Sequence, residues 1–203
     1  LKTLAVIGPN ADDAEVMLGN YNGDPAHPVT PLEGIREKLG AEKVLYARGS
    51  DLAAGMPWFE TVPETALWHD EHGVRQPGLQ GDYYGTANLT GVQTRPREAP
   101  GPVPENPEVV FTRTDAKVDF LWWDGAPREG MNDDDFGVRW TGWLEAPVSG
   151  EYRLGATGFN AFELYLEGKR LARFNNLHER GYAWEPVTLE AGKRYELRLD
   201  FHH

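Results

Sequence analysis

The chain has 203 residues, and its 32 Asp and Glu against 20 Lys and Arg give a formal net charge of −12. Such a surface repels nucleic-acid phosphates and anionic lipid headgroups, so neither a nucleic acid nor a membrane is expected as a partner. The chain contains no Cys, which excludes disulfides and thiolate metal sites, and no apolar run approaches the roughly 18 residues of a membrane span.

The first fifty-five residues predict a β-α-β unit. Residues 4–8 (LAVIG) form a compact apolar run that ends in Gly, which is typical of a buried parallel strand. Thr30 is expected to cap a helix, with Glu33 completing a capping box and Gly40 ending the helix. Residues 43–47 predict the second strand. Because two strands and one helix cannot bury both faces of a parallel sheet, the unit is expected to dock against further chain.

A strand that ends in Gly8 ahead of a helix also resembles the first turn of a dinucleotide-binding unit. The glycine pattern of such a turn, G-x-G-x-x-G, is missing. Pro9 removes an amide that would face phosphate, and Asp12 and Asp13 place negative charge where a pyrophosphate would bind. Nucleotide binding is therefore not expected.

Residues 56–77 lack a clean periodicity and predict a linker between two domains. His69 and His72, with Asp70 and Glu71 between them, have a spacing that suits two metal ligands on one helix face. No third ligand is evident, so solvated linker histidines are expected instead of a metal site.

The rest of the chain alternates in the way of antiparallel strands with one buried face. Between residues 137 and 201 the apolar positions share one parity within each run, and Pro, Ser and Gly mark the turns between runs. Strands are also expected at 109–111 and 118–122, whereas the Pro-rich segment 95–108 predicts an extended surface loop. The expected fold class is an α/β fragment, the β-α-β part of a mostly parallel sheet, followed by an all-β antiparallel sandwich. The expected domains are residues 1–55, a linker at 56–77, and residues 78–203.

Motifs in both parts resemble known families. KTLAVIGPNADD, LGNYNGDP, TPLEGI and VLYARGSDL, in this order, are similar to the start of the second (α/β sandwich) domain of family 3 glycoside hydrolases. GLQGDYYG, VRWTGWLEAP, SGEYRL, LYLEGKRL and LEAGKRYELRLDF resemble the protective-antigen-type (PA-fourteen) β-sandwich. Some of those hydrolases carry such a sandwich inserted in their second domain. The two resemblances together identify the chain as the start of that domain with its inserted sandwich.

The resemblance implies an exo-acting, retaining β-glycosidase of the β-glucosidase or β-xylosidase type. Such chemistry needs two carboxyl groups about 5–5.5 Å apart. In the family the nucleophile lies on a preceding barrel domain and the acid/base further along the second domain. No catalytic residue is therefore expected in this segment, which alone is expected to be inactive. The expected partners are an oligosaccharide or glycoside substrate and the rest of the same polypeptide; a homo-oligomer is left open, and a periplasmic or secreted location is favoured over a cytoplasmic one.

Substrate contacts are expected from aromatic and amide side chains, because a ring stacks on the apolar face of a pyranose and an amide pairs with hydroxyls. Asn20 and Tyr21 follow the first strand, in a region where members of the family place aromatics near the sugar. One of Trp122 and Trp123 must lie off the core, where it packs under a loop or stacks on a sugar, and Trp123 is the candidate. A polar loop, expected to reach another domain or to be an ordinary hairpin connection, supplies the remaining candidates: Phe174, Asn175, Asn176 and His178.

Calcium is not expected as a ligand of the sandwich. Asp133, Asp134 and Asp135 form an acidic loop that offers ligands towards the roughly 6–8 oxygens of a Ca²⁺ site, but a solvated loop is expected there. Lectin-like members of the protective-antigen family hold Ca²⁺ with two vicinal Asp, and Phe159 and Asn160 stand at those positions here. No cofactor is therefore expected, and the sandwich is expected to shape or cover a neighbouring active-site pocket. A non-catalytic carbohydrate-binding or adhesive module is the alternative.

Overall fold

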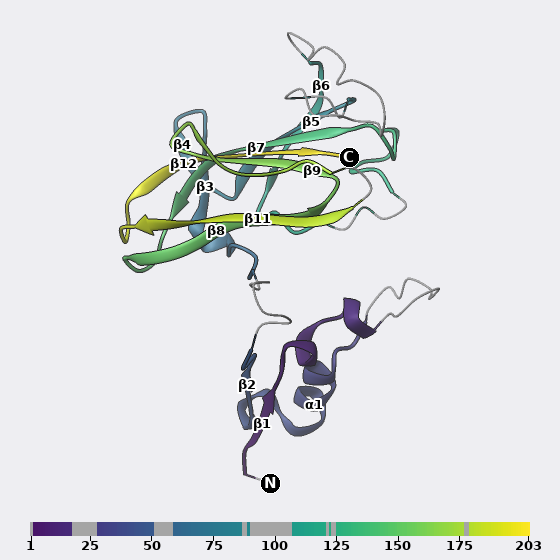
Figure 1. The fold of residues 1–203 in the computed structure, drawn as a ribbon, viewed down its shortest axis with the longest axis vertical. Coiled ribbons are helices and arrows are strands. Elements are labelled where there is room, and N and C mark those ends of the chain that lie inside the picture. Colours follow the sequence, from purple (N-terminus) through teal and green to yellow (C-terminus); the bar gives the residue numbers. More distant parts are fainter. Residues whose placement is uncertain are drawn as a thin grey trace. The chain divides into compact units, whose positions relative to one another are not determined.

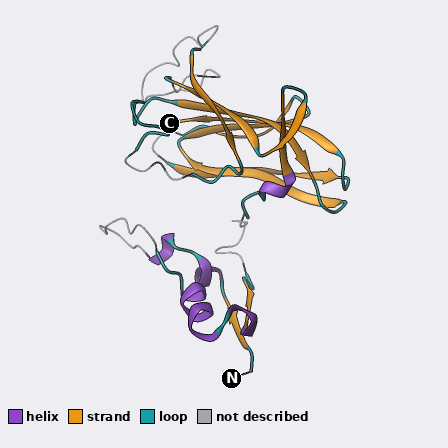
Figure 2. Ribbon diagram, turned by 180° about the vertical axis from the view of Figure 1, so that it is seen from behind, coloured by secondary structure: helices purple, strands orange, loops and turns teal. Residues whose placement is uncertain are grey.

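The computed structural model of the chain (Figure 1) describes residues 2–17, 28–50, 59–86, 89, 107–120, 122, 125–176 and 179–203. The chain divides into two compact units, Leu1–Trp58 and Phe59–His203. Figure 2 shows that most of the helical turns belong to the first unit, whereas the second is built almost entirely from strands. Within the described ranges, no helix has the length and apolar character needed to cross a membrane.

The first unit is a small β-α-β arrangement. β1 (Leu4–Ile7) pairs in parallel with β2 (Val44–Ala47), and α1 (Pro31–Leu39) lies between them in the chain. Short 3-10 turns surround the helix: η1 (Pro9–Asp12), η2 (Glu15–Met17) and η3 (Ala41–Lys43). The predicted capping box is confirmed, because the Glu33 amide donates to Thr30 Oγ1 at 3.2 Å and the Thr30 amide donates to the Glu33 carboxylate at 2.9 Å. Gly40 ends the helix with a φ of 91°.

One face of this parallel sheet is left open by the described residues of the first unit. The covered side includes the buried residues Leu32 and Val44. On the other side the register pairs Ala5 with Leu45 and Ile7 with Ala47, so these four apolar residues share one face. Ile7 is 69% exposed and Leu45 is 62% exposed. The open face of the sheet is therefore entirely apolar.

The second unit is an antiparallel sandwich of two layers. The larger sheet has the strand order β10-β9-β12-β7-β3-β4, and β5 joins it by pairing with both β7 and β6. The strands of this sheet are β3 (Leu67–Glu71), β4 (Val74–Pro77), β5 (Leu79–Tyr84), β6 (Val109–Asp115), β7 (Gly137–Glu145), β9 (Ala161–Leu166), β10 (Lys169–Phe174) and β12 (Arg194–His202). β8 (Gly150–Phe159) and β11 (Arg180–Leu189) form a separate two-stranded ribbon, which Figure 1 shows as the layer opposite β7, β9 and β12.

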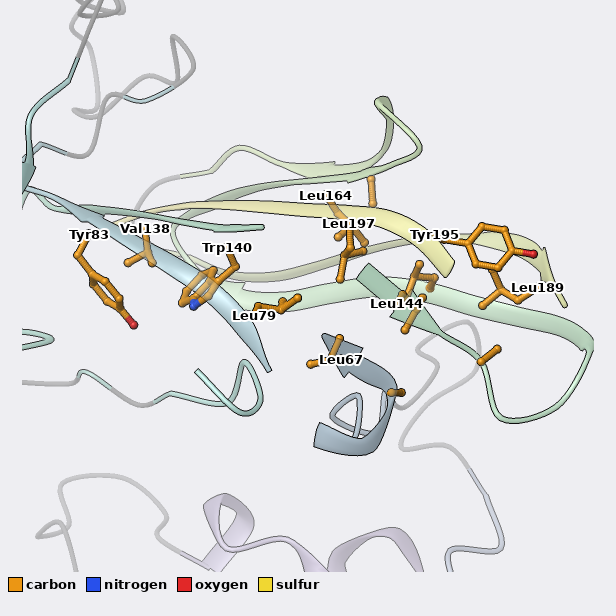
Figure 3. Packing of buried hydrophobic residues seen from close by; sticks show 14 of the residues in the cluster. Leu67, Leu79, Tyr83, Val138, Trp140, Leu144, Leu164, Leu189, Tyr195 and Leu197 are labelled. Atoms are coloured by element: carbon orange, nitrogen blue, oxygen red, sulfur yellow. The ribbon is translucent and has the colours of Figure 1, made fainter. Parts of the chain in front are cut away.

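The core of the sandwich lies between the ribbon and the larger sheet (Figure 3). The predicted parity of the central strand is confirmed, since Val138, Trp140 and Leu144 of β7 are all buried. Leu154 of β8 and Leu189 of β11 enter the same cluster from the ribbon. Burial of this apolar surface, at about 25 cal/mol per Å², is the main force that holds the two layers together.

A hairpin lies within the segment that the sequence predicts as a linker. η4 (Glu64–Ala66) leads into β3 and β4, which pair with each other, while Leu67 pairs with Leu144 of β7. A side chain at Gly142 would overlap the carbonyl oxygen of Trp68, so glycine is needed where β3 meets β7. Strands of four or five residues are too short for their alternation to stand out in the sequence.

The predicted solvated histidines have different environments. His69 is buried in β3, where its Nδ1 lies 3.0 Å from the Gly78 carbonyl oxygen and its Nε2 lies 3.2 Å from Thr114 Oγ1. The expectation of a solvated side chain is therefore wrong for His69, because cross-strand pairing brings its polar partners to it. His72 is exposed in the β3–β4 turn, where it has a φ of 51°.

The strand predicted at residues 118–122 does not form among the described residues of that segment. The Phe120 ring stacks on Trp122 at a centroid distance of 4.8 Å and on Trp140 at 5.8 Å. Trp122 also lies edge-on to Phe136 at 5.4 Å. The apolar character of this segment therefore serves aromatic packing against the sandwich, not a backbone ladder.

Candidate functional site

Loops that are distant in sequence meet at one end of the sandwich, which we call the loop end and define by Asp134, Phe136, Asn160, Glu179 and His203. The His203 amide donates to the Phe136 carbonyl oxygen at 2.9 Å, and the Asn160 amide donates to that of Glu179 at 3.0 Å. The His203 ring lies between two side chains, with Nδ1 3.3 Å from Asn160 Nδ2 and Nε2 3.7 Å from Asp134 Oδ1. The loop end thus joins the predicted acidic loop to the loop between β10 and β11.

Asn160 occupies the position at which lectin-like sandwiches were expected to carry a carboxylate. Its side chain is buried, its φ is 69°, and its amide group faces His203. Asn adopts this left-handed conformation more readily than most residues, because its short polar side chain can hydrogen-bond to nearby groups and offset the steric strain. Phe159, the preceding residue, is 44% exposed. The pair therefore offers one neutral amide in place of two carboxylates.

The acidic loop does not assemble a metal centre with other described side chains. Asp133, Asp134 and Asp135 are all exposed, and the Asp134 side chain is 92% exposed. Across the described ranges, no group of three or more His, Asp or Glu side chains converges as metal ligands would. An open depression next to the loop is lined by residues 125, 126 and 128–133.

The predicted substrate-binding residues Phe174, Asn175 and Asn176 lie in different environments. Phe174 is the last residue of β10, and its ring stacks on Phe162 at 5.9 Å and lies where a side chain on Gly181 would be. Phe174 is therefore held within the sandwich and does not begin an extended loop. Asn175 and Asn176 are exposed, and the Asn176 amide donates to the Glu179 carboxylate.

Four of the predicted site residues lie outside the described residues and stay predictions: Asn20, Tyr21, Trp123 and His178.

One buried carboxylate lies inside the core, and sequence reasoning did not single it out. Asp115 accepts hydrogen bonds from the Tyr83 hydroxyl at 2.6 Å and from Trp140 Nε1 at 2.7 Å. Arg113 Nε donates to the other oxygen at 2.6 Å. Burial of the Tyr83 hydroxyl, and next the adjacent carboxylate, raise the pKa of Tyr83. Asp115 is therefore fully engaged in holding β5, β6 and β7 together.

Two further carboxylates are buried on the outer face of the larger sheet. Asp200 accepts from both Arg139 Nε at 2.6 Å and Arg139 Nη2 at 3.1 Å, and this bond raises the pKa of the Arg139 guanidinium. Glu163 is fully covered as well, with Arg170 at 3.1 Å and Arg173 at 3.3 Å. In sequence both acids look like ordinary solvent-facing positions of alternating strands. Both carboxylates are thus paired with guanidinium groups, and Glu163 also accepts a hydrogen bond from the Tyr165 hydroxyl at 3.1 Å.

Comparisons with known proteins cover both units. The family model described as the PA14 domain matches residues 76–203. A xylan 1,4-β-xylosidase of Xylanibacter ruminicola is 29% identical over 202 residues, which is 98% of this chain and 21% of that protein. An anti-sigma-I factor of Acetivibrio thermocellus is 26% identical over 125 residues, 62% of this chain and 17% of that protein. Among solved structures, a β-glucosidase from Kluyveromyces marxianus has a TM-score of 0.54 at 21% identity, over 97% of this chain and 23% of that one.

Proposed function

The chain belongs to the PA14 domain family, and from this premise we propose that it is part of a larger exo-acting β-glycosidase of the β-glucosidase or β-xylosidase type. Relatives that carry these names align with both units, and the expected resemblance is thereby confirmed. The chain spans only about a fifth of the length of those relatives. The observation that carries the proposal is the alignment of 98% of this chain, β-α-β unit and sandwich in one order, with a single xylosidase.

In this proposal the catalytic groups lie outside these residues. Retaining hydrolysis needs one carboxylate as nucleophile and a second carboxyl as acid/base, separated by about 5–5.5 Å. The buried carboxylates Asp115, Glu163 and Asp200 are each paired with arginine, which supports a structural role for all three. The segment alone is expected to be inactive on a glycoside.

The rest of the polypeptide is also the proposed partner of the β-α-β unit. Parallel sheets are normally covered on both faces, and here Ile7 and Leu45 expose an apolar face among the described residues. We expect elements of a larger α/β domain to cover that face and to extend the two-stranded sheet. The unit is then the start of a mostly parallel sheet, as the sequence resemblance implies.

The sandwich is proposed to shape or cover the active-site pocket through its loop end. Support comes from the exposed amides of Asn175 and Asn176, which are suited to hydroxyl groups of a sugar. The Asn160 amide donates to the Glu179 carbonyl oxygen, and the Asn160 side chain faces His203. These contacts hold the base of the loop between β10 and β11 against the core. A pocket wall built on such a fixed base can present hydrogen-bonding groups without a large ordering cost.

The test is hydrolysis by the full-length parent protein. We expect it to release the aglycone from an aryl β-xyloside or an aryl β-glucoside with retention of configuration, and we expect the 203-residue segment to release none. Shortening the loop at 175–179 in the parent should raise KM or change aglycone preference. Unchanged kinetics in the shortened variant would contradict the pocket role, and no hydrolysis by the parent would contradict the glycosidase.

A second candidate is a non-catalytic carbohydrate-binding module. It is favoured by the anti-sigma-I factor, because a sandwich of this kind occurs there in a protein that is not named as a glycosidase. It predicts that residues 59–203 bind xylo-oligosaccharides by themselves, which titration calorimetry measures. A loss of binding on adding a chelator, restored by Ca²⁺, would show that this binding depends on a divalent cation.

A further inference from the structure

The outward face of the β8–β11 ribbon carries a row of aromatic rings, which we call the aromatic strip and define by Phe159, Tyr182 and Trp184. Leu154 and Leu189 of the ribbon enter the core, so the alternate positions of both strands face away from it. Phe159 is 44% exposed and Tyr182 is 39% exposed. The strip is therefore accessible on a regular strand face and does not depend on a loop.

Two rings of the strip, Trp184 and Tyr182, have close neighbours that restrict their positions. Trp184 pairs across the strands with Gly155, and a side chain on Gly155 would overlap the Ala183 carbonyl oxygen and the Trp184 Cβ. Glycine at this position lets β11 approach β8 closely beneath the indole. The Phe59 ring lies 6.5 Å from Tyr182 at an interplanar angle of 46°. A preformed row of rings loses little entropy when a flat ligand stacks on it.

The charged groups along the strip are mainly arginines. The Arg153 guanidinium lies over the Trp184 ring at 5.2 Å, and Arg180 is paired in register with Phe159. Glu151, at the far end of β8, is the single acidic residue among the outward positions of the ribbon, all of which are described. The chain as a whole has a net charge of −12. The outward face of the ribbon thus carries two arginines against one glutamate, an excess of one positive charge on a protein that is acidic as a whole.

We propose that the aromatic strip binds an oligosaccharide that carries a uronic acid carboxylate. The choice of a carbohydrate rests on the proposed function; the choice of an acidic one rests on the charge of this face. Aromatic rings stack on the apolar C–H faces of pyranoses, and a guanidinium pairs with a carboxylate through two parallel hydrogen bonds. Arg153 and Phe159 are six residue steps apart along β8, roughly 20 Å of strand, which suits a ligand of several sugar units.

The test is calorimetric titration of the 203-residue chain with two probes: xylotetraose bearing one glucuronic acid branch, and unbranched xylotetraose. We expect the acidic probe to bind more tightly and to lose affinity as salt is raised. Trp184→Ala should weaken binding of the acidic probe about tenfold or more. Arg153→Gln should remove the preference for the acidic probe while leaving the neutral probe unchanged.

The matched control is Arg75→Gln, because Arg75 also covers an indole, that of Trp68 at 3.6 Å, but on a strand of the other sheet. This variant should bind both probes like the unaltered chain, and thermal unfolding checks that every variant is folded. Equal affinity for the two probes, or unaltered binding by folded Trp184→Ala, would overturn the proposal. So would a concentration-dependent dimer that Trp184→Ala abolishes, since a second copy would then occupy the strip. Hydrolysis by the parent without binding here defeats only this inference, and binding here without hydrolysis defeats only the glycosidase.

Discussion

The two units of this chain differ in how completely they bury their own apolar faces. In the sandwich, residues from eight or more strands enter one cluster, and the charged groups Asp115, Glu163 and Asp200 are paired where they are buried. In the β-α-β unit, Leu32 and Val44 are buried, while Ile7 and Leu45 remain exposed. The difference follows from sheet type, because an antiparallel sandwich covers itself with its own second layer, whereas a parallel sheet depends on elements on both faces.

The largest effect is expected when the two units are expressed separately. Residues 59–203 expressed alone should unfold in one cooperative transition in urea, since their core is internal to them. Residues 1–58 expressed alone should show no cooperative transition, because two strands and one helix bury too little apolar surface. Circular dichroism along a urea titration measures both. A cooperative transition in 1–58 would mean that the open face does not need a partner.

A second prediction compares the effect of Leu45→Lys on stability in the 203-residue chain and in the full-length parent protein. Leu45→Lys in the 203-residue chain should change the free energy of unfolding by no more than about 0.5 kcal/mol, because Leu45 is 62% exposed. In the full-length parent the same change should cost about 3 kcal/mol or more, since it would leave an unpaired charge in a covered interface.

Glu42→Lys is the matched control for this experiment, because the Glu42 side chain is 73% exposed in the same unit. It should be tolerated in both contexts when thermal unfolding is compared. An equally mild effect of Leu45→Lys in the parent would show that the apolar face stays open there.

Local patterns predicted those parts of the fold that depend on neighbours in sequence. The capping box joins Thr30 and Glu33, three residues apart, and the core face of β7 follows from alternate residues; both are confirmed. The β3–β4 hairpin was not predicted, because Leu67 finds its partner Leu144 far along the chain. Topology decided that pairing, and a short strand carries no sign of it.

The candidate site shows the same division between local and long-range information. The acidic loop and the exposed amides after β10 were visible as polar segments. The link between the two loops was not visible, because it runs through His203, which follows β12, and through Asn160, whose backbone amide donates to the Glu179 carbonyl oxygen. The burial of Asp200 was not visible, because Arg139 reaches it from the adjacent strand β7 and Arg198 from its own strand β12, and both cover what reads as a solvent-facing position. In β8 and β11 the parity of each strand separates outward from core positions, but only the register shows that Phe159 of β8 shares a face with Tyr182 and Trp184 of β11.

Alkaline pH should weaken the sandwich through its buried tyrosines. Burial, reinforced by Asp115, raises the pKa of Tyr83 above its ordinary value of 10.0, so the folded chain keeps a proton that the unfolded chain loses above about pH 10. The free energy of unfolding should therefore fall as pH rises beyond 10, by up to about 1.4 kcal/mol per pH unit for this one group. Burial also raises the pKa values of Tyr84 and Tyr165, which adds to the same slope.

Tyr83→Phe separates the contribution of this one hydroxyl from the rest. At about pH 8 the variant should be less stable by about 1–2 kcal/mol, because Asp115 loses a buried donor. Between about pH 10 and 11 its stability should fall less steeply than that of the unaltered chain. Urea titrations at each pH measure both differences. Parallel slopes in the two proteins would contradict the assignment to Tyr83.

The smallest expected effect is confined to the first unit. Thr30→Ala removes the oxygen that accepts from the Glu33 amide and the hydroxyl that donates to Asp12 Oδ1 at 3.0 Å. Loss of such a cap costs about 1 kcal/mol, so amides of α1 should exchange with deuterium about fivefold faster. Thr30→Ser keeps the hydroxyl and should exchange nearly as the unaltered chain does. Amides of β7 should be unaffected in both variants, because the sandwich is stabilised by its own core; faster exchange in β7 would show that the two units share their stability.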